Sequence, residues 1–352
     1  MPKPLRRPIP AVFQPSLERL HAEAARLFGH PSIELLPETY EERPFSYLLL
    51  AGVKPAGSPS TTTHIFIKVY KATPERLAQM KQRVAEDYQV HTAVQTHMAG
   101  LNDLGTVRPL ACYPENLTIV TERAAGETLL DYVLARAAWL PGEAQQRTMS
   151  AAMEGIGRWI RAFQTFKAGS NLISIEEHVE YVDVRLRRLV DNGIFSPVER
   201  EQLLTRLREL GALVPPSDLR EVALHADLAT TNILVAGTRV TVLDFAMATR
   251  GSYLHDISRL SMQIGMFRAK PHYRPAVIRR LQLALLRGLD PDMGMSHPLF
   301  RFLSILHHVN HYGTLSLKPE PFPGRLFSWR VRRIHRAFLV REMNAAGTAN
   351  IP

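Results

Sequence analysis

The residues best suited to chemistry lie together in one stretch of the chain, residues 224–260. Within it, His225, Asp227 and Asn232 follow the pattern H-x-D-x4-N, and Asp244 comes twelve residues after the asparagine. An aspartate can orient a hydroxyl and accept its proton, while an asparagine and a second aspartate can supply the oxygen ligands that Mg²⁺ prefers. Transfer of a phosphoryl group needs this positioning and this neutralisation of charge. The stretch predicts magnesium-assisted phosphoryl transfer. The alternative is that Asp227 and Asn232 cap turns and Asp244 ends a strand.

Patterns of apolar residues predict the elements in the first part of the chain. Apolar and β-branched runs predict antiparallel strands at residues 32–37, 45–53 and 64–70, then a helix from Thr73 to about His97, then strands at residues 106–113 and 117–122. Thr73 can cap that helix, with Pro74 at the first helical position. Residues 54–63, rich in Pro, Gly, Ser and Thr, predict an exposed turn.

Long amphipathic stretches dominate the chain after Leu129. They predict helices at residues 144–166, 179–190, 197–210 and 324–343, the last with an apolar stripe that packs and a basic face in solvent. A strand at residues 221–225 and a hairpin at residues 232–245, turning at residues 236–238, surround the H-x-D-x4-N pattern. Strands first and helices later predict an α+β fold with a small N-terminal lobe, residues 1–122, and a larger, mainly helical lobe, residues 123–352.

In these motifs the chain resembles the aminoglycoside phosphotransferase and choline kinase-like family, which shares the protein-kinase fold. The resemblance extends from about residue 32 to at least residue 260 and is most specific in the stretch just described. It implies that Asp227 is the catalytic base, that Asn232 and Asp244 hold Mg²⁺, and that ATP is the phosphate donor. We therefore expect a two-lobed, protein-kinase-like fold with a nucleotide-binding N-terminal lobe and a catalytic, substrate-binding C-terminal lobe.

The same resemblance implies roles for residues around this core. His225 and Asp256 are expected to brace the catalytic loop, although Asp256 considered by itself predicts a helix cap. Lys68, late in an apolar strand, matches the lysine that contacts the α and β phosphates. Glu86 in the following helix is its expected ion-pair partner, with Asp87 as the alternative.

Three further segments bear on nucleotide binding and on the catalytic loop. The segment that begins at Glu122 resembles the hinge whose backbone receives the adenine. The loop between the first two strands contains no glycine, so Ser46 and backbone amides near Arg43 are expected to make the phosphate contact there. Ala226 stands where the family usually has a glycine.

Composition and charge limit the partners and the compartment. The formal net charge of +10 indicates contact with something anionic, and nucleotide, acidic glycolipid, membrane surface and nucleic acid all qualify. We expect ATP and a small-molecule hydroxyl, no nucleic acid, and peripheral contact with anionic lipid or glycolipid as the alternative use of the basic segment at residues 324–343. The single cysteine, Cys112, and the lack of a long apolar run predict a cytoplasmic protein.

The expected activity is ATP-dependent phosphorylation of a hydroxyl on a small molecule such as a sugar or glycoconjugate intermediate. His307 and His311, one helical turn apart, predict a polar helix face, with contact to substrate or to a metal as alternatives. The rival hypothesis is a catalytically silent, kinase-like nucleotide-binding module, which the glycine-free loop suggests. A kinase of protein side chains is disfavoured because no segment ending in A-P-E follows Asp244.

Overall fold

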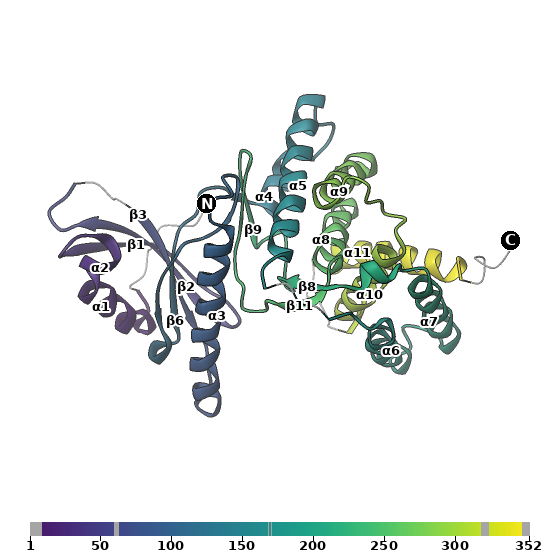
Figure 1. Ribbon diagram of the computed structural model, residues 1–352, viewed down its shortest axis with the longest axis horizontal. Helices are drawn as coiled ribbons and strands as arrows, with labels where there is room; N and C mark the ends of the chain where they lie inside the picture. Colours follow the sequence, from purple (N-terminus) through teal and green to yellow (C-terminus); the bar gives the residue numbers. More distant parts are fainter. Residues whose placement is uncertain (1–8, 60–62, 168, 170, 318–323, 347–352) are drawn as a thin grey trace. The chain divides into compact units, whose positions relative to one another are not determined.

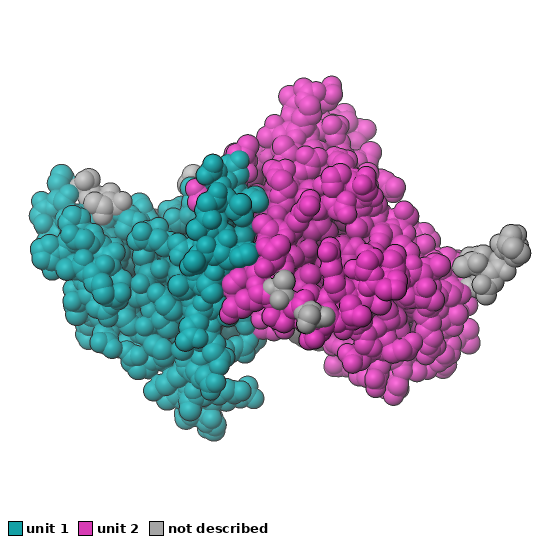
Figure 2. All heavy atoms as spheres, in the orientation of Figure 1, with its two compact units in different colours: residues 1–126, 241–246 teal, residues 127–240, 247–352 magenta. Residues whose placement is uncertain are grey.

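The chain divides into two compact units, which Figure 2 distinguishes by colour. The computed structural model describes residues 9–59, 63–167, 169, 171–317 and 324–346. Unit 1 comprises residues 1–126 and 241–246, and unit 2 comprises residues 127–240 and 247–352. The first boundary therefore follows Gly126. The separation of nucleotide binding and catalysis between lobes at residues 1–122 and 123–352 stays a prediction.

Unit 1 is built on a five-stranded antiparallel sheet with the strand order β1-β2-β3-β6-β5 (Figure 1). Its elements are η1 (Ala11–Phe13), α1 (Gln14–Ala22), α2 (Ala24–Phe28), β1 (Ile33–Glu42), β2 (Ser46–Pro55), β3 (Thr63–Tyr70), η2 (Pro74–Arg76), α3 (Leu77–Met98), β4 (Leu104–Thr106), β5 (Pro109–Tyr113), η3 (Pro114–Asn116) and β6 (Thr118–Glu122). The predicted strands and the predicted helix are confirmed. Pro74 begins η2, but the side chain of Thr73 makes no capping hydrogen bond within the described chain.

Two layers of helix cover the sheet of unit 1. Ile65 and Ile67 of β3 are completely buried and pack in one cluster with Phe13 and Leu20, from η1 and α1. These first helices were not predicted from the sequence, although Phe13 and Leu20 fall on one helical face. Because side chains alternate along a strand, Lys68 and Tyr70 point to the opposite face, where Tyr70 packs with Val84 of α3.

Unit 2 is mainly helical. Its elements are β7 (Glu127–Thr128), α4 (Leu129–Arg136), α5 (Glu143–Gln164), α6 (Ile175–Asp191), α7 (Pro197–Ala212), η4 (Pro216–Leu219), β8 (Glu221–Leu224), β9 (Ile233–Ala236), β10 (Arg239–Val242), β11 (Thr249–Ser252), α8 (His255–Gly265), η5 (Met266–Ala269), α9 (Pro275–Leu289), α10 (Pro298–Leu317) and α11 (Gly324–Asn344), and the end of β10 lies in the segment assigned to unit 1. The predicted hairpin is formed by β9 and β10, and β8 pairs antiparallel with β11.

Two glycines allow α5 and α9 to pack closely against each other. A Cβ atom at Gly157 of α5 would collide with the backbone carbonyl of Leu285, and one at Gly288 of α9 would collide with the carbonyl of Glu154. The backbones of α5 and α9 therefore touch where they cross, which only glycine permits. In α11, Val331 and Leu339 are buried as the predicted apolar stripe requires, whereas Leu326, Phe327 and Trp329, at the start of the helix, are exposed.

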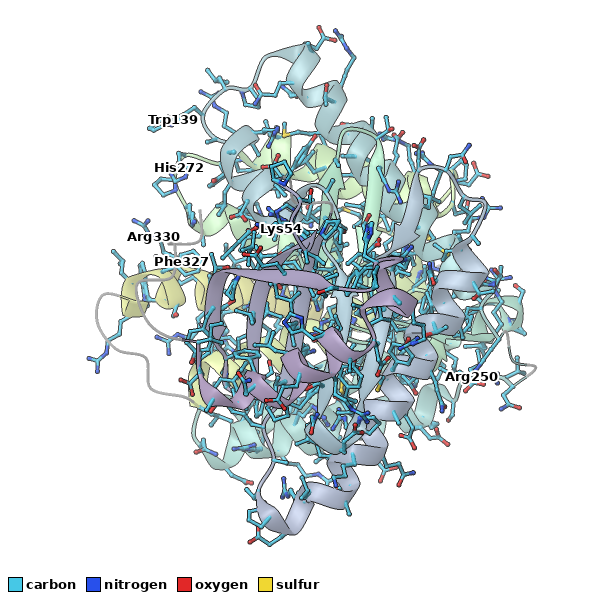
Figure 3. The ribbon with its side chains drawn as sticks, turned by 90° about the vertical axis from the view of Figure 1, so that its left-hand side faces the viewer. Lys54, Trp139, Arg250, His272, Phe327 and Arg330 are labelled. Atoms are coloured by element: carbon cyan, nitrogen blue, oxygen red, sulfur yellow. The ribbon has the colours of Figure 1, made fainter. Side chains whose placement is uncertain are left out.

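Side chains on the surface of unit 2 include several large aromatic rings. Figure 3 shows Trp139 beside His272, and their ring centroids are 5.8 Å apart. Phe327 and Arg330, both on α11, are labelled in the same view, and Phe327 is 45% exposed. Contact of this helix with anionic lipid stays a prediction. Within the described chain, every helix is too short or too polar to cross a membrane.

A chain of neighbouring histidines links α10 to α11, with His308 and His335 buried and His311 partly buried. His335 Nε2 lies 2.7 Å from His311 Nδ1, and His335 Nδ1 lies 2.9 Å from His308 Nδ1. Burial lowers the pKa of all three imidazoles, that of His335 to about 3, and the neighbouring imidazoles lower it further for His308 and His335. His91 in unit 1 is also buried, which lowers its pKa to about 4. These side chains are therefore neutral in the folded protein at pH 7.

We expect the free energy of unfolding to fall as the pH drops below about 6.5. The unfolded chain then takes up protons on these imidazoles while the folded chain does not, so stability is lost between about pH 6.5 and the lowered folded pKa values. Each such histidine contributes up to about 1.4 kcal/mol per pH unit. Urea unfolding at pH 7.5, 6.5 and 5.5 measures the slope. His335→Gln should reduce it, while His21→Gln, at an exposed position, should not; a flat profile in the wild type would contradict the assignment.

Candidate active site

The predicted catalytic loop joins β8 to β9, and one buried carboxylate accepts hydrogen bonds from its backbone. Asp256, in the first turn of α8, is 2% exposed. Its Oδ2 accepts a hydrogen bond from the backbone amide of His225 at 2.7 Å, and its Oδ1 accepts one from the amide of Ala226 at 3.0 Å. Both oxygens of Asp256 thus fix the backbone immediately before Asp227, which is the arrangement expected of a residue that braces this loop.

The charge of Asp256 is stabilised by its surroundings. Burial acts to raise the pKa of this carboxyl, but the imidazole of His255, the imidazole of His225 and the amide of His225 outweigh burial, so its pKa lies below the ordinary value. His225 itself is completely buried. The side chains predicted to support the loop therefore form one buried unit, with the negative charge of Asp256 at its centre.

Asp227 follows this buried unit in the loop, and one of its two carboxylate oxygens accepts a hydrogen bond from another side chain. Arg259 Nη2 donates to Asp227 Oδ1 at 2.7 Å, and Arg259 Nη1 donates to the carbonyl of Ala226. The side chain of Asp227 is 47% exposed, and among the described residues its Oδ2 has no hydrogen-bond partner. Asn232 Nδ2 donates to the carbonyl of Asp227 at 3.1 Å, which ties the end of the loop to its start. One oxygen is thus positioned by a cation, and the other is available to a substrate.

Ala226 has a left-handed backbone, with φ of +60°. This conformation suits glycine and is unfavourable for other residues by roughly 1 kcal/mol or more. The hydrogen bond from its amide to Asp256 offsets that cost. The physical reason for the glycine that related proteins usually carry here is therefore visible in the backbone of this chain. Strained residues of this kind concentrate at functional sites.

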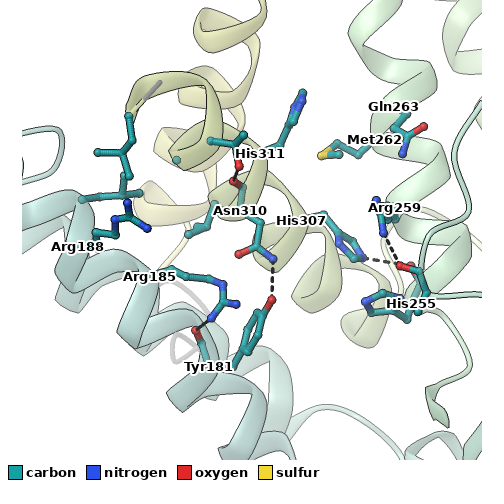
Figure 4. A pocket seen from close by; sticks show the side chains of 16 residues that line it. Tyr181, Arg185, Arg188, His255, Arg259, Met262, Gln263, His307, Asn310 and His311 are labelled. Atoms are coloured by element: carbon teal, nitrogen blue, oxygen red, sulfur yellow. Dashed lines mark hydrogen bonds between the residues drawn. The ribbon is translucent and has the colours of Figure 1, made fainter. Parts of the chain in front are cut away.

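A cavity of about 770 Å³ in unit 2 opens beside the catalytic loop (Figure 4). Ala226 and Arg259 line it at the loop, and Met262 and Val309 provide apolar surface. The other lining residues come from α6, α8 and α10: Tyr181, Arg185, Arg188, Leu189, His255, Gln263, His307, Asn310, His311, Gly313, Thr314 and Leu317. His307 and His311 were predicted from the sequence as candidate site residues, but Arg259 and the residues of α6 were not.

His307 is a structural part of this cavity wall. Its Nε2 lies 3.1 Å from both the carbonyl of His255 and Ser258 Oγ. Burial, followed by the charges of His255 and Arg259, holds its pKa well below the usual range. The side chain is buried, so the predicted polar helix face at His307 is packed inside unit 2.

In unit 1, Lys68 and Asp244 form an ion pair. Lys68 Nζ lies 3.0 Å from Asp244 Oδ2, and the two side chains are 23% and 38% exposed. Asp244 has φ of +65°, and the next residue, Phe245, is buried with its ring 5.3 Å from that of His91. Burial of Phe245 anchors the segment after β10 in unit 1, which brings Asp244 to the lysine predicted to contact phosphates.

The helical carboxylate near Lys68 is that of Asp87, the alternative, and not that of Glu86. Glu86 lies on the exposed face of α3, where Gln82 Nε2 donates to it at 2.8 Å. Asp87, one residue further around the helix, is buried, and the hydroxyl of Tyr70 donates to its Oδ2 at 2.5 Å. Burial raises the pKa of Asp87, while the bond from Tyr70 and the positive charge of Lys68 act to lower it. The ammonium of Lys68 also lies 4.6 Å from the centre of the Tyr70 ring.

The predicted phosphate and adenine contacts in unit 1 occupy structured positions. Ser46 is the first residue of β2 and is 5% exposed, and the amide of Arg43 donates to its carbonyl at 2.8 Å. That amide is therefore already used within the turn. Glu122 ends β6, where Arg108 pairs with its carboxylate at 3.0 Å. The roles of Ser46 and Glu122 in nucleotide binding stay predictions.

The residues predicted to hold Mg²⁺ have suitable donor atoms. Magnesium prefers carboxylate and carbonyl oxygens and is often held by one or two protein ligands together with phosphates. Asp244 offers a partly exposed carboxylate, and the bond from Asn232 Nδ2 to the loop leaves its side-chain carbonyl as the ligating atom. Among the described residues no group of three His, Cys, Asp or Glu side chains could hold a metal, so a metal at His307 and His311 lacks a third ligand.

The structure resembles solved phosphotransferases along almost its whole length. A thermostable mutant of aminoglycoside phosphotransferase APH(4)-Ia, in ternary complex with ADP and hygromycin B, aligns with a TM-score of 0.54 and 15% identity over 93% of this chain and 99% of that chain. A choline/ethanolamine kinase family protein from Mesorhizobium loti aligns with a TM-score of 0.53 and 12% identity, over 94% of this chain and 99% of that chain. Macrolide 2'-phosphotransferase MphH from Brachybacterium faecium, as apoenzyme, aligns with a TM-score of 0.52 and 16% identity, over 92% of this chain and 98% of that chain. These similarities show a shared protein-kinase-like fold, which confirms the predicted fold class.

The family is established by sequence. No curated protein matches the chain significantly. The model of the phosphotransferase enzyme family, however, matches residues 81–291, more than half of the chain, and this range includes the catalytic loop, Asp244 and Asp256. The predicted family resemblance is therefore confirmed. The chain belongs to the phosphotransferase enzyme family, and it is an enzyme of the kinase type with an alcohol group as phosphoryl acceptor.

Proposed function

We propose that this enzyme transfers the terminal phosphate of ATP to a hydroxyl of a small molecule bound in the cavity of unit 2. The observation that carries the proposal is the position of the catalytic loop at that cavity. Ala226 and Arg259 line the cavity, and Arg259 bonds directly to Asp227. A hydroxyl held in the cavity can therefore reach the carboxylate whose second oxygen is available.

The proposed reaction uses Asp227 as the proton acceptor. The acceptor hydroxyl donates a hydrogen bond to Asp227 Oδ2, while Arg259 holds Oδ1 at 2.7 Å. The hydroxyl oxygen then forms a bond to the γ-phosphorus, the bond from that phosphorus to the bridging oxygen breaks, and ADP leaves with the electron pair. The hydroxyl proton passes to the carboxylate as the bond to phosphorus forms.

Five further residues have proposed roles in this reaction. Lys68 contacts the phosphates of ATP, and Asp244, its partner in the structure, binds Mg²⁺ together with Asn232. Magnesium, when bound, neutralises charge on the phosphates. Asp256 and His225 keep the loop in place, because their hydrogen-bonding and burial fix the backbone next to Asp227.

The acceptor we propose is a sugar or a glycoconjugate intermediate. The cavity combines apolar surface with uncharged hydrogen-bonding groups from Tyr181, Gln263, Asn310 and Thr314. Its volume of about 770 Å³ lies within the range of small-molecule sites and exceeds the needs of one sugar ring. Polyhydroxylated compounds match such a lining, because each hydroxyl both donates and accepts hydrogen bonds.

We expect Lys68→Met to lower kcat/KM for ATP by about 10- to 100-fold, since a charge-assisted contact to phosphate is lost. The carboxylate of Asp244 would also lose the ammonium that lies 3.0 Å from it. Lys71→Met is the matched control, because Lys71 follows the same strand but pairs with Glu42. Initial rates at varied ATP test this prediction. Equal effects of the two substitutions would contradict the proposed contact.

The experiment that tests the proposed function measures transfer of labelled phosphate from ATP, with and without Mg²⁺, to sugars, aminoglycosides, choline-like alcohols and glycolipid precursors. Asp227→Asn serves as the negative control. A labelled product that needs Mg²⁺ and appears only with the wild type would support the proposal and identify the acceptor class. An acceptor outside the sugars and glycoconjugates would contradict the proposed substrate.

The turn between β1 and β2 favours a second candidate, a catalytically silent nucleotide-binding module. Phe45 in this turn is 83% exposed, while Ser46 is buried and the amide of Arg43 is already bonded. Fewer donors thus face a phosphate than a glycine-rich turn would offer. Measurable ATP binding, combined with no transfer to any acceptor in the panel, would favour this candidate.

A further inference from the structure

The cavity beside the catalytic loop is basic. Three arginines line it, Arg185, Arg188 and Arg259, and none of its described lining residues is acidic. We propose that the phosphoryl acceptor carries an anionic group, a phosphate or a carboxylate, that binds to Arg185 and Arg188 while its hydroxyl approaches Asp227. This inference rests on the proposed function, because it names the chemical class of the acceptor for the same site.

The arginines lie at different parts of the cavity, and this separates their tasks (Figure 4). Arg259 comes from α8 and lies on the side of the catalytic loop, near His255. Arg185 and Arg188 both come from α6, and Figure 4 shows them on the other side of Asn310. A molecule that spans the cavity would place one end at the loop and the other at α6.

The positive charge at the α6 end is not compensated within the cavity. Arg259 is neutralised by its bond to Asp227, whereas Arg185 is held by hydrogen bonding to the carbonyl of Tyr181 at 2.9 Å and by stacking 3.2 Å above the Tyr181 ring. These contacts fix the guanidinium of Arg185 without supplying a negative charge. Arg188, one helical turn further along α6, adds a second cation. Guanidinium pairs are well suited to bind phosphate and carboxylate groups.

His307 and His311 do not contribute to this charge near neutral pH. Burial lowers the pKa of His307 and of His311, so both imidazoles are neutral at pH 7. Recognition of the anion therefore depends on the arginines, which keep their charge over the whole physiological range. We expect binding of the anion by the protein to be nearly constant between pH 7 and pH 8.5, apart from ionisation of the ligand itself.

A buried polar atom at the cavity indicates that the ligand also carries hydroxyl groups. Asn310 Nδ2 lies 3.4 Å from the hydroxyl of Tyr181, but its buried Oδ1 has no hydrogen-bond partner among the described residues. His255 Nδ1, in contrast, faces the Asp256 carboxylate at 3.6 Å, so Asn310 Oδ1 is the atom left for a ligand hydroxyl. Buried polar atoms of this kind are normally satisfied. A hydroxylated, anionic acceptor would donate a hydrogen bond to Asn310 Oδ1, whereas a polycationic amino sugar would place ammonium groups against two arginines.

Binding of a small anion tests this inference without any turnover. Methyl phosphate is titrated into the full chain and followed by isothermal titration calorimetry. The variant is Arg185→Ala combined with Arg188→Ala, and the control is Arg161→Ala combined with Arg208→Ala, which removes two exposed arginines outside the cavity. We expect saturable binding that weakens about 10- to 100-fold in the variant and is unchanged in the control. Absence of saturable binding, or equal binding by the variant, would overturn the inference.

Kinetics with matched acceptors provide the second arm. Glucose, glucose 6-phosphate, glucuronate and glucosamine share a ring and differ in charge. We expect the anionic pair to be preferred and the preference to be lost in the variant at Arg185 and Arg188. A neutral or cationic acceptor that reacts best would overturn the inference, while methyl phosphate binding without any transfer would count against the proposed function alone. Arg185→Lys combined with Arg188→Lys, which keeps the charge, should retain much of the anion binding and so separate charge from folding.

Discussion

Replacement of Asp227 by asparagine is expected to reduce kcat by about 10²- to 10⁴-fold, the usual contribution of a positioned general base. The substitution keeps the size of the side chain, and the asparagine oxygen can still accept the bond from Arg259 that now reaches Oδ1. What is lost is the second carboxylate oxygen and the negative charge, so the acceptor hydroxyl has no base. The substitution therefore slows the chemical step and leaves nucleotide binding largely unchanged.

The measurement pairs single-turnover rates with equilibrium binding of a non-hydrolysable ATP analogue. We expect the analogue to bind Asp227→Asn within about threefold of the wild-type affinity, because Lys68 and Asp244 are unchanged. Asp191→Asn, at the exposed end of α6, removes the same charge away from the loop and serves as control. Turnover at the wild-type rate would exclude Asp227 as the base, and a parallel loss of analogue binding would assign it to the nucleotide site.

Local sequence signals predicted the fold well because they act over short distances. The alternation in β3 places Lys68 on the face opposite the core, and the hairpin turn at Gly237 separates β9 from β10. The H-x-D-x4-N spacing similarly predicted a loop, since its residues are neighbours in the chain. Each of these features depends on contacts between residues that are close together in the sequence.

The parts that the sequence could not provide depend on distant contacts. Arg259 follows Asp256 by three residues, yet its bond to Asp227 joins residues separated by the β hairpin, β11 and the first turn of α8. The choice of Asp87 over Glu86 depended on which face of α3 packs against Tyr70, and adjacent helical residues differ by about 100° in direction. The residues that line the cavity come from α6, α8 and α10, so no single sequence motif predicts the cavity.

Replacement of Asp256 by asparagine is expected to lower the free energy of unfolding by about 3–5 kcal/mol, the usual effect of breaking a buried, hydrogen-bonded charge. Two backbone amides, those of His225 and Ala226, donate to the two oxygens of this carboxylate. An asparagine can accept only one of them, and its amino group would face the other donor. The left-handed conformation of Ala226 would also lose the bond that offsets its strain.

Urea unfolding and steady-state kinetics together test whether Asp256 acts through the loop. We expect kcat to fall while the KM for ATP changes little, because Asp256 contacts the loop backbone and not the nucleotide. Asp292→Asn, an exposed aspartate between α9 and α10, is the control for the loss of one charge. Asp256→Glu retains the charge but changes the hydrogen-bond distances from the carboxylate to the amides of His225 and Ala226. It should therefore recover part of the stability and little of the kcat. If Asp256→Asn unfolds at the wild-type urea concentration, the two amides do not depend on this carboxylate, and the loop must be held by other contacts.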